Sequence, residues 1–253
     1  HGVIYAEEYG WDATFEAMVA RVAADFIDQF KPGREVCWIA ERSGTILGSA
    51  FVVEKSDEGV SFGAKERKLG IKGSPTREVY FDNVRIPADR MIGAEGTGFE
   101  TAMRTLDHTR VTIAAQAVGV AQGALDYALG YAQEREQFGK PIADFQAVQL
   151  KLAEMAMKVE ASRLLIHRAV TRAEHGFPSV ADSSIAKCFA NEMAREVTGA
   201  ALQLMGGYGY SKSYKAEQRM RDAWGWGIAG GTIDIQKINI AAALVGRRFD
   251  QRR

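Results

Sequence analysis

The spacing of apolar residues changes along the chain near residue 98. Before that point apolar residues form short runs interrupted by Gly and Pro, and after it they recur at intervals of three or four over long stretches. Short runs are typical of strands, and a period of about 3.6 residues is typical of amphipathic helices. The pattern therefore predicts an α+β segment, a partial β-domain, over residues 1–97 and a helical bundle over residues 98–253.

The first region shows one helical pattern followed by four strand patterns. Residues 12–30 carry apolar side chains at helical spacing and are followed by Pro32, which predicts that a helix ends there. Strands are predicted over residues 36–40, 45–53, 59–62 and 77–84. In the last of these, Val79 and Phe81 alternate with polar residues, so one face of that strand is expected to be buried.

Four apolar stripes in the second region predict four helices. The first runs from Phe99 to Ala128 and predicts a helix over 99–130, roughly 48 Å long at ~1.5 Å per residue; the others cover 148–169, 185–204 and 233–245. Ser179 or Asp182 is expected to cap the third helix, and Thr232 the fourth. Long helices joined by short loops predict a mainly α fold, a four-helix bundle preceded by a small α+β segment.

Composition and charge exclude several classes of protein. Lys and Arg together number 32, as do Asp and Glu, so the chain lacks the basic character of a nucleic-acid-binding protein. No apolar run reaches the ~20 residues of a membrane helix. Cys37 and Cys188 lie far apart, and the four His residues have no metal-ligand spacing. We therefore expect a cytoplasmic protein that binds no metal, nucleic acid or membrane.

A few polar residues do not belong in a plain bundle. Arg110 lies on the first apolar stripe, where burial requires a partner; an intrahelical pair with Asp107 is the simpler interpretation, and contact with an anionic or carbonyl-bearing ligand is the alternative. The Gly-rich runs at 206–209 and 230–231 indicate either helix ends or backbone that approaches a phosphate. The polar loop around Arg135 is explained equally well by solvation or by ligand contact.

Six segments occur in an order that resembles the acyl-CoA dehydrogenase family, and the resemblance covers about residues 48–253. They are KLGIKGSPTREVYFDNVRIP, GFETAMRTLDHTR, REQFGKPIADFQAVQLKLAEM, LQLMGGYGY, MRDA and GGTIDIQ. The resemblance implies FAD as cofactor and an acyl-CoA substrate that loses two hydrogens across its Cα–Cβ bond. In that family the flavin lies beside Cβ, a base beside Cα, and hydrogen bonds hold the thioester carbonyl.

Matched to the family's motifs, these segments also imply individual roles. Asp107 and Arg110 fall where the family contacts substrate. The implied FAD contacts are Arg135, Gln137 and Phe138 in one loop, Gln203, Gly206 and Gly207 in a segment lent to a neighbouring subunit, and Thr232 and Gln236 at the start of the last helix. A site shared in this way implies a homodimer or a homotetramer.

The chain departs from the family's pattern at the catalytic base. Family members carry a Glu either just before the Gly-Thr of the last motif, where this chain has Gly230, or just before the arginine of the first bundle helix, where it has Thr109. No catalytic residue is therefore assigned, and impaired dehydrogenation is expected. After the GGYGY segment the family's acid and base are replaced by Ser213 and Gln218, whereas Asp222 matches. A non-catalytic bundle subunit that pairs with a complete dehydrogenase is an alternative.

The start of the chain resembles a different family. No segment here matches the dehydrogenases' N-terminal helical domain or the first half of their β-domain. Residues 1–53 weakly resemble the start of a GNAT-type acyltransferase, although that family's pyrophosphate-binding Gln/Arg-x-x-Gly-x-Gly/Ala element does not follow. The pattern indicates a fused chain, and acetyl transfer is the third functional hypothesis.

Overall fold

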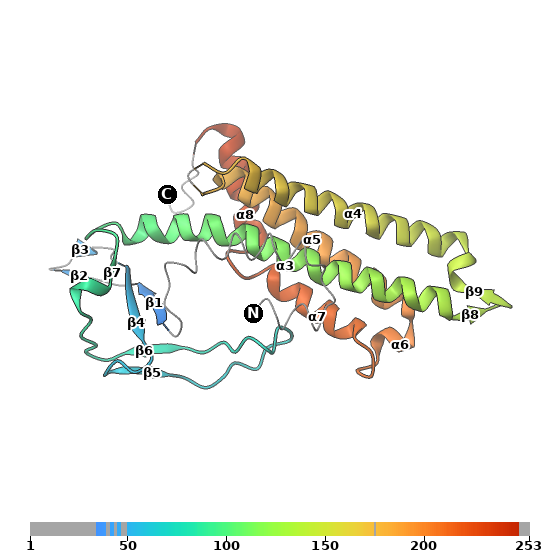
Figure 1. Ribbon diagram of the computed structural model, residues 1–253, viewed down its shortest axis with the longest axis horizontal. Coiled ribbons are helices and arrows are strands. Elements are labelled where there is room, and N and C mark those ends of the chain that lie inside the picture. Colours follow the sequence, from blue (N-terminus) through green and yellow to red (C-terminus); the bar gives the residue numbers. More distant parts are fainter. Residues whose placement is uncertain (1–33, 39–40, 43–44, 47–49, 175, 248–253) are drawn as a thin grey trace. The chain divides into compact units, whose positions relative to one another are not determined.

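Helices dominate the computed structural model, which describes residues 34–38, 41–42, 45–46, 50–174 and 176–247 (Figure 1). The chain divides into two compact units. One contains residues 69–71 and the described residues from Asp107 onward; the other contains the remaining described residues from 34 to 106. The predicted helix over 12–30 and most of the acyltransferase-like segment lie outside the described residues.

Short antiparallel strands make up the smaller unit. Its three-stranded sheet has the order β1-β4-β7, with Arg34 paired to Glu54 and Ala50 paired to Ile92. Asp57 accepts hydrogen bonds of 2.9 and 2.8 Å from Arg90 Nη1, which ties the turn after β4 to the segment before β7. The strands are β1 (Arg34–Trp38), β2 (Glu41–Arg42), β3 (Thr45–Ile46), β4 (Ala50–Glu54), β5 (Val60–Phe62), β6 (Val79–Phe81) and β7 (Met91–Ile92).

The burial predicted for the strand around residue 80 is wrong. β6 has only three residues and forms a two-stranded sheet with β5. Val79 and Phe81 each keep 40% of their surface exposed. Alternation correctly predicted a strand, but burial of its face requires a second layer, and none packs on Val79 and Phe81 within the described residues.

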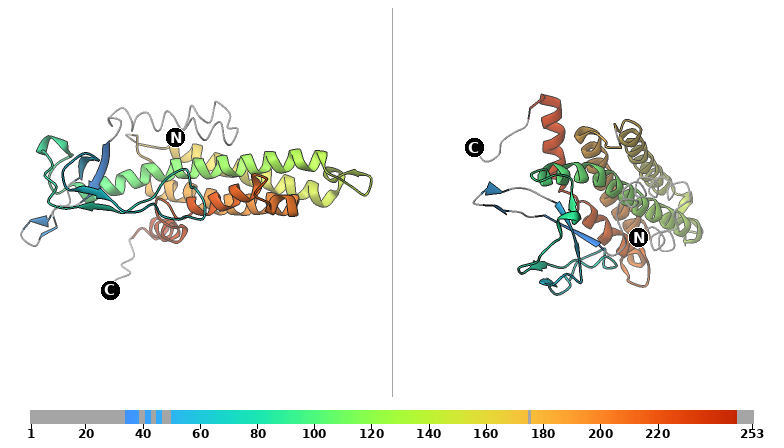
Figure 2. Two further views of the ribbon diagram at one scale, coloured as in Figure 1. Left: turned by 90° about the horizontal axis from the view of Figure 1, so that it is seen from below. Right: turned by 60° about the vertical axis from the view of Figure 1, so that its left-hand side comes forward.

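The larger unit confirms the mainly helical fold class. Its helices are α3 (Gly98–Glu134, which begins in the smaller unit), α4 (Gln146–Thr171), α5 (Val180–Met205), α6 (Gly207–Tyr210), α7 (Ala216–Trp226) and α8 (Ile233–Val245). A hairpin of β8 (Glu136–Gln137) and β9 (Lys140–Pro141) joins α3 to α4. Figures 1 and 2 show α3, α4 and α5 lying side by side. No helix in the described part of the chain is long and apolar enough to cross a membrane.

Hydroxyl side chains begin two of these helices as predicted. Ser179, rather than Asp182, is the N-cap of α5, and its Oγ accepts a 3.0 Å hydrogen bond from the main-chain N–H of Asp182. Thr232 is the N-cap of α8. At the other end of α5, Gly206 adopts a φ of +58°, a conformation that favours glycine. These local signals fix where the bundle helices begin and end.

The core of the bundle consists largely of small residues. α3 contributes Ala114, Ala117, Ala121, Ala124 and Ala128, each no more than 1% exposed. Facing helices contribute Met155, Val159 and Ile166 from α4, Ala190, Ala194 and Val197 from α5, and Ala223 and Trp226 from α7. Alanine keeps the helix axes close and is the best helix former, so the same residues favour both the helix and its packing.

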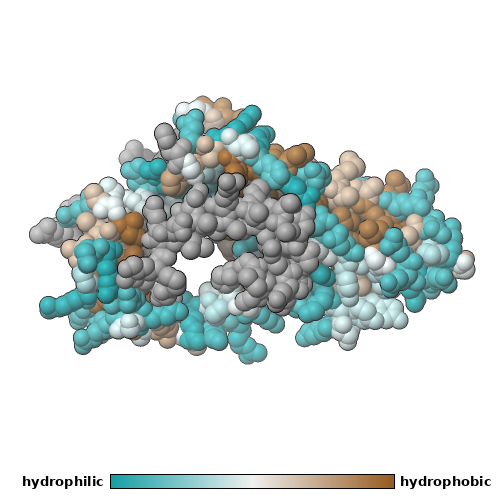
Figure 3. All heavy atoms as spheres, in the orientation of Figure 1, coloured by the Kyte–Doolittle hydropathy of each residue, from teal (hydrophilic) through white to brown (hydrophobic). Residues whose placement is uncertain are grey.

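The apolar stripe on α3 is buried over only part of its length. Phe99 and Met103 are 69% and 38% exposed, whereas the stripe is buried from Ala117 to Ala128. The first turns of α3 belong to the smaller unit, where no helix covers them among the described residues. Apolar residues also reach the surface elsewhere on the bundle, as the brown patches in Figure 3 show.

The sequence pattern predicted neither the short α6 nor α7. α7 has only 11 residues, and the polar run from Glu217 to Asp222 is interrupted by a single large apolar residue, Met220. Nevertheless α7 contributes to the core cluster, whereas α8 buries only Ile233 and Gln236. α5 packs against α4, α7 and α8, which makes it the central helix of this unit.

A short segment before the bundle in sequence is fastened to α7. The main-chain N–H of Ile71 donates a 2.6 Å hydrogen bond to Asp222 Oδ1, and Arg221 donates one of 2.7 Å to the carbonyl of Leu69. A Cβ at Gly70 would lie 2.6 Å from both Arg221 O and Asp222 Oδ1, so only glycine allows this approach. Asp222 therefore has a structural role.

Replacement of Ile166 by Ala tests the core. Ile166 is fully buried on α4, whereas Leu164 on the same helix is 58% exposed. We expect Ile166→Ala to lower the free energy of unfolding by about 2–5 kcal/mol because it leaves a cavity, and Leu164→Ala to lower it by less than about 1 kcal/mol. Urea denaturation measures both, and equal losses would contradict the packing described.

Candidate functional site

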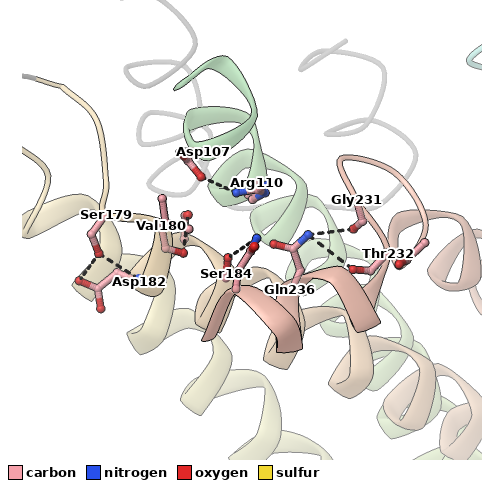
Figure 4. Close-up of polar contacts among 11 residues, drawn as sticks. Asp107, Arg110, Ser179, Val180, Asp182, Ser184, Gly231, Thr232 and Gln236 are labelled. Atoms are coloured by element: carbon pink, nitrogen blue, oxygen red, sulfur yellow. Dashed lines mark hydrogen bonds and ion pairs between the residues drawn. The ribbon is translucent and has the colours of Figure 1, made fainter. Parts of the chain in front are cut away.

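A buried arginine on α3 lies close to the start of α8 (Figure 4). Arg110 is 6% exposed and forms an ion pair with Asp107, one turn earlier on the same helix. Its Nε atom is buried and has no hydrogen-bond partner among the residues that the structure describes. The intrahelical pair expected from the spacing is thus present, and it leaves part of the guanidinium unsatisfied.

The start of α8 presents backbone and amide groups. Thr232 Oγ1 accepts a 3.4 Å hydrogen bond from the N–H of Ile235. Gln236, one turn further, is fully buried, and its Nε2 donates to the carbonyls of Gly231 at 3.1 Å and Thr232 at 3.5 Å. Its Oε1 is buried and accepts no hydrogen bond from the described part of the chain. A helix N-terminus and an unsatisfied amide oxygen therefore lie together here.

A lysine that the sequence analysis missed lies behind the start of α8. Lys187 on α5 is fully buried and donates hydrogen bonds of 3.3 and 2.5 Å to the carbonyls of Gly227 and Gly231. Burial lowers the pKa of Lys187 to about 8, with smaller contributions in the same direction from Arg110 and Arg195. The signal available in the sequence was a cation flanked by the apolar pair Ala186 and Cys188.

Gly230 occupies the position where the resemblance led us to expect a catalytic Glu. Its φ is +66°, and a Cβ placed there would lie 2.5 Å from Ile113 Cδ1 on α3. Ile113 packs against the core cluster, so it cannot withdraw freely. Backbone conformation and packing therefore both favour the absence of a side chain at this position.

His108 points toward the loop after α4. Its Nδ1 lies 3.4 Å from the carbonyl oxygen of Gly176, and its ring packs edge-on against Phe177 at 5.9 Å between centroids. These contacts occupy His108 at the α4–α5 connection. Thr109, which occupies the expected base position on α3, carries no carboxylate.

The remaining predicted FAD contacts gather at the far end of α3. Arg135 lies over the ring of Tyr208 at 5.7 Å, which brings the α3–α4 hairpin beside α6. The hairpin residues Gln137 and Phe138 are exposed, Phe138 at 93% and with a φ of +55°. Gln203, Gly206 and Gly207 are also exposed. An accessible cation, aromatic rings and glycine backbone thus lie at one end of the bundle.

The structure therefore divides the predicted site residues into two groups. Asp107, Arg110, Thr232 and Gln236 form one, and the residues around Arg135 and Gly206 form the other. At ~1.5 Å per residue, Arg110 and Arg135 lie about 37 Å apart along α3. One chain does not bring the two groups together.

Among the described residues, no group of three or more His, Cys, Asp or Glu side chains could hold a metal ion. The first group offers hydrogen-bond donors from backbone N–H groups and from the guanidinium of Arg110, whose charge is paired with Asp107. Such donors bind anions and carbonyl oxygens. The Oε1 of Gln236 is an acceptor at the same place.

The family of the chain follows from its sequence beyond residue 95. Residues 96–245 match the family described as acyl-CoA dehydrogenase, C-terminal domain. The chain belongs to the acyl-CoA dehydrogenase family. The matched region contains five of the six segments, and the first, at residues 68–87, precedes it.

Individual acyl-CoA dehydrogenases support this assignment. The chain is 58% identical over 198 residues to the probable acyl-CoA dehydrogenase FadE25 of Mycobacterium tuberculosis, covering 78% of this chain and 51% of the relative. Butyryl-CoA dehydrogenase from Megasphaera elsdenii superposes with a TM-score of 0.79 and 41% identity, over 84% of this chain and 55% of that one. A glutaryl-coenzyme A dehydrogenase solved with glutaryl-CoA superposes with a TM-score of 0.78 and 36% identity, over 85% of this chain and 55% of that one.

The chain spans about half the length of the curated acyl-CoA dehydrogenases that it matches. The match therefore identifies the family of the helical region. The roles of Asp107, Arg110 and the eight implied FAD contacts stay predictions.

The depressed pKa of Lys187 predicts how stability depends on pH. Between about pH 8 and the ordinary lysine pKa near 10.4, the unfolded chain keeps this proton while the folded chain has released it, so stability rises with pH. Relative to Lys187→Met, the wild type should therefore gain stability across this window and show a constant difference from pH 6 to 7. Denaturant unfolding of both proteins at a series of pH values measures this difference, and a difference that falls above pH 8 would contradict the depressed pKa.

Proposed function

We propose that this chain functions as a FAD-dependent protein of the acyl-CoA dehydrogenase type, acting on an acyl-CoA thioester. The observation that carries the proposal is the family match over residues 96–245, because it includes every residue assigned to FAD or substrate. The solved relative bound to glutaryl-CoA supports an acyl-CoA ligand.

The donors present suit a flavin dinucleotide. The exposed Arg135 offers a guanidinium to a phosphate, and the start of α8 offers backbone N–H groups with the positive end of a helix dipole. The buried, unpartnered Oε1 of Gln236 can accept a hydrogen bond from a ligand hydroxyl or ring N–H. When bound, FAD would supply the acceptor for the hydride that leaves Cβ. Asp107 and Arg110 would orient the substrate.

The separation of the two groups favours a shared site. Arg135 and Gly206 lie at one end of α3, about 37 Å from Arg110 along the helix. Two copies arranged about a symmetry axis can bring the first group of one copy to the second group of the other. We therefore propose a homodimer or a homotetramer in which each FAD touches two subunits.

The absence of a carboxylate at Thr109 and Gly230 favours slow dehydrogenation. Proton abstraction by a positioned base is worth about 10²–10⁴ in rate, and neither position of this chain carries such a base. A second candidate function follows, a binding subunit that assembles with a complete dehydrogenase. In that case acyl-CoA and FAD would bind without turnover.

Flavin binding tests the proposal. Protein purified with added FAD should keep flavin absorbance through gel filtration, and saturated acyl-CoAs should perturb that spectrum. Arg135→Ala should weaken FAD binding by about 10- to 100-fold, the value of a charge-assisted hydrogen bond. Arg172→Ala, which removes an exposed arginine from the end of α4, should leave it unchanged. A colourless protein under saturating FAD would exclude the flavin role.

A designed base tests the interpretation of Gly230. Gly230→Glu alone should bleach flavin poorly with acyl-CoA, because a positive φ costs about 1–2 kcal/mol and Ile113 occupies the space. Combining it with Ile113→Ala should raise the bleaching rate by about 10²-fold or more.

The matched control for this design is Gly230→Gln with Ile113→Ala, which has the same shape but cannot take the proton. Single-turnover bleaching is measured for all three variants. If the Gln variant bleaches as fast as the Glu variant, the missing base does not limit the reaction.

A further inference from the structure

Lys187 is a fully buried lysine whose described hydrogen bonds go to main-chain carbonyls. Removing an ammonium group from water is costly, and attraction to a carboxylate usually offsets that cost. Here the acceptors are two neutral oxygens, and the charges nearby include Arg110 and Arg195, which have the same sign. Burying this amine costs more free energy than burying an apolar side chain of equal volume. We therefore look for its role in the two carbonyl groups to which it donates hydrogen bonds.

The two carbonyls belong to the ends of two different helices. Gly227 is the C-cap of α7, and Gly231 directly precedes Thr232, the N-cap of α8. Lys187 lies on α5 and bonds to both, at 3.3 and 2.5 Å. One amine thus fixes the turn from 227 to 231 against the central helix. Even a neutral amine keeps two N–H donors, which match the two acceptors.

The turn depends on contacts with other elements because its two glycines can adopt many backbone conformations. Gly230 and Gly231 have φ values of +66° and +96°, and glycine populates many other conformations at little cost. Ile228 and Ala229 both donate their N–H groups to the carbonyl of Gly225, which closes only the first part of the turn.

Neighbouring contacts act on the same turn. Arg195, two turns after Lys187 on α5, donates a 3.4 Å hydrogen bond to the carbonyl of Trp224 and lies over its ring at 4.2 Å. A cation near the C-terminal end of α7 interacts favourably with the dipole of that helix. Gln236 shares the Gly231 carbonyl with Lys187. The placement of Gln236 and Thr232 is therefore coupled to that of Lys187.

We propose that Lys187 is a positioning residue that holds the Gly227–Gly231 turn, and with it Thr232 and Gln236, in the conformation that receives the ligand. The identity of that ligand as FAD rests on the proposed function above. The fastening of the turn does not, because it concerns contacts within this chain.

Hydrogen exchange in the protein without ligand tests the fastening. In Lys187→Met, which keeps the volume and removes the donors, the amides of Ile228 and Ala229 should exchange at least tenfold faster, while those of the α3 core at Ala117 and Ala121 keep their rates. Lys237→Met is the matched control, since Lys237 also links α8 to α5, by a 2.6 Å hydrogen bond to Glu192, but is 55% exposed. It should leave the turn's exchange rates unchanged.

FAD affinity provides the second measurement. Lys187→Met should weaken FAD binding at least tenfold at a temperature where the variant is fully folded, and Lys187→Arg, which keeps a cation with several donors, should restore part of it. Weaker binding with unchanged exchange at Ile228 and Ala229 would overturn the proposal. If no variant and no wild-type protein binds FAD, the proposed function fails while the exchange result still decides the role of Lys187.

If Lys187→Met does not fold, the wild type alone remains informative. A turn held by Lys187 should protect the amides of Ile228 and Ala229 to within tenfold of the buried α5 amides at Ala190 and Ala194. Exchange of the turn close to the rate of an unfolded peptide would overturn the proposal.

Discussion

The central position of α5 among the other helices is the constraint on which the helical unit depends. This helix packs against α4, α7 and α8 and shares a core cluster with α3. A helix in that position has little surface on which to leave polar side chains. Each polar group that α5 buries must find its partner inside the protein or remain unsatisfied.

The polar residues of α5 meet this constraint in different ways. Thr198 donates to the carbonyl of Ala194 at 2.7 Å, and the Nδ2 of Asn191 donates to that of Lys187 at 2.7 Å. The Oδ1 of Asn191 is buried with no hydrogen-bond partner among the described residues. Ser184 accepts a 3.4 Å hydrogen bond from Asn239 on α8. Lys187 reaches furthest, to the turn between α7 and α8. The polar groups thus connect α5 to α8, which buries little apolar surface of its own.

Most of the fold could be predicted from the sequence, because its signals are local. The stripe from Ala117 to Ala128 and the caps at Ser179 and Thr232 depend on residues near in sequence, and they lie where expected. The exposure of Phe99 and Val79 could not be predicted, because burial depends on what packs above a stripe or a strand. α7 has too few apolar residues to show a period, although it supplies Trp226 to the core.

The candidate site could be predicted only through motifs. Spacing identified Arg110 and its partner Asp107, and the family resemblance selected the residues around Arg135 and Gln236. Neither revealed Lys187 or the contact of Ile113 with Gly230, because both depend on helices that meet only in three dimensions.

The contact of Ile113 with Gly230 determines whether a catalytic base can be placed at this position. A carboxylate lost by one substitution would leave space for its side chain, whereas here Ile113 fills the space and the backbone adopts a φ of +66°. The position is therefore packed for glycine, and a base introduced there requires a second change on α3.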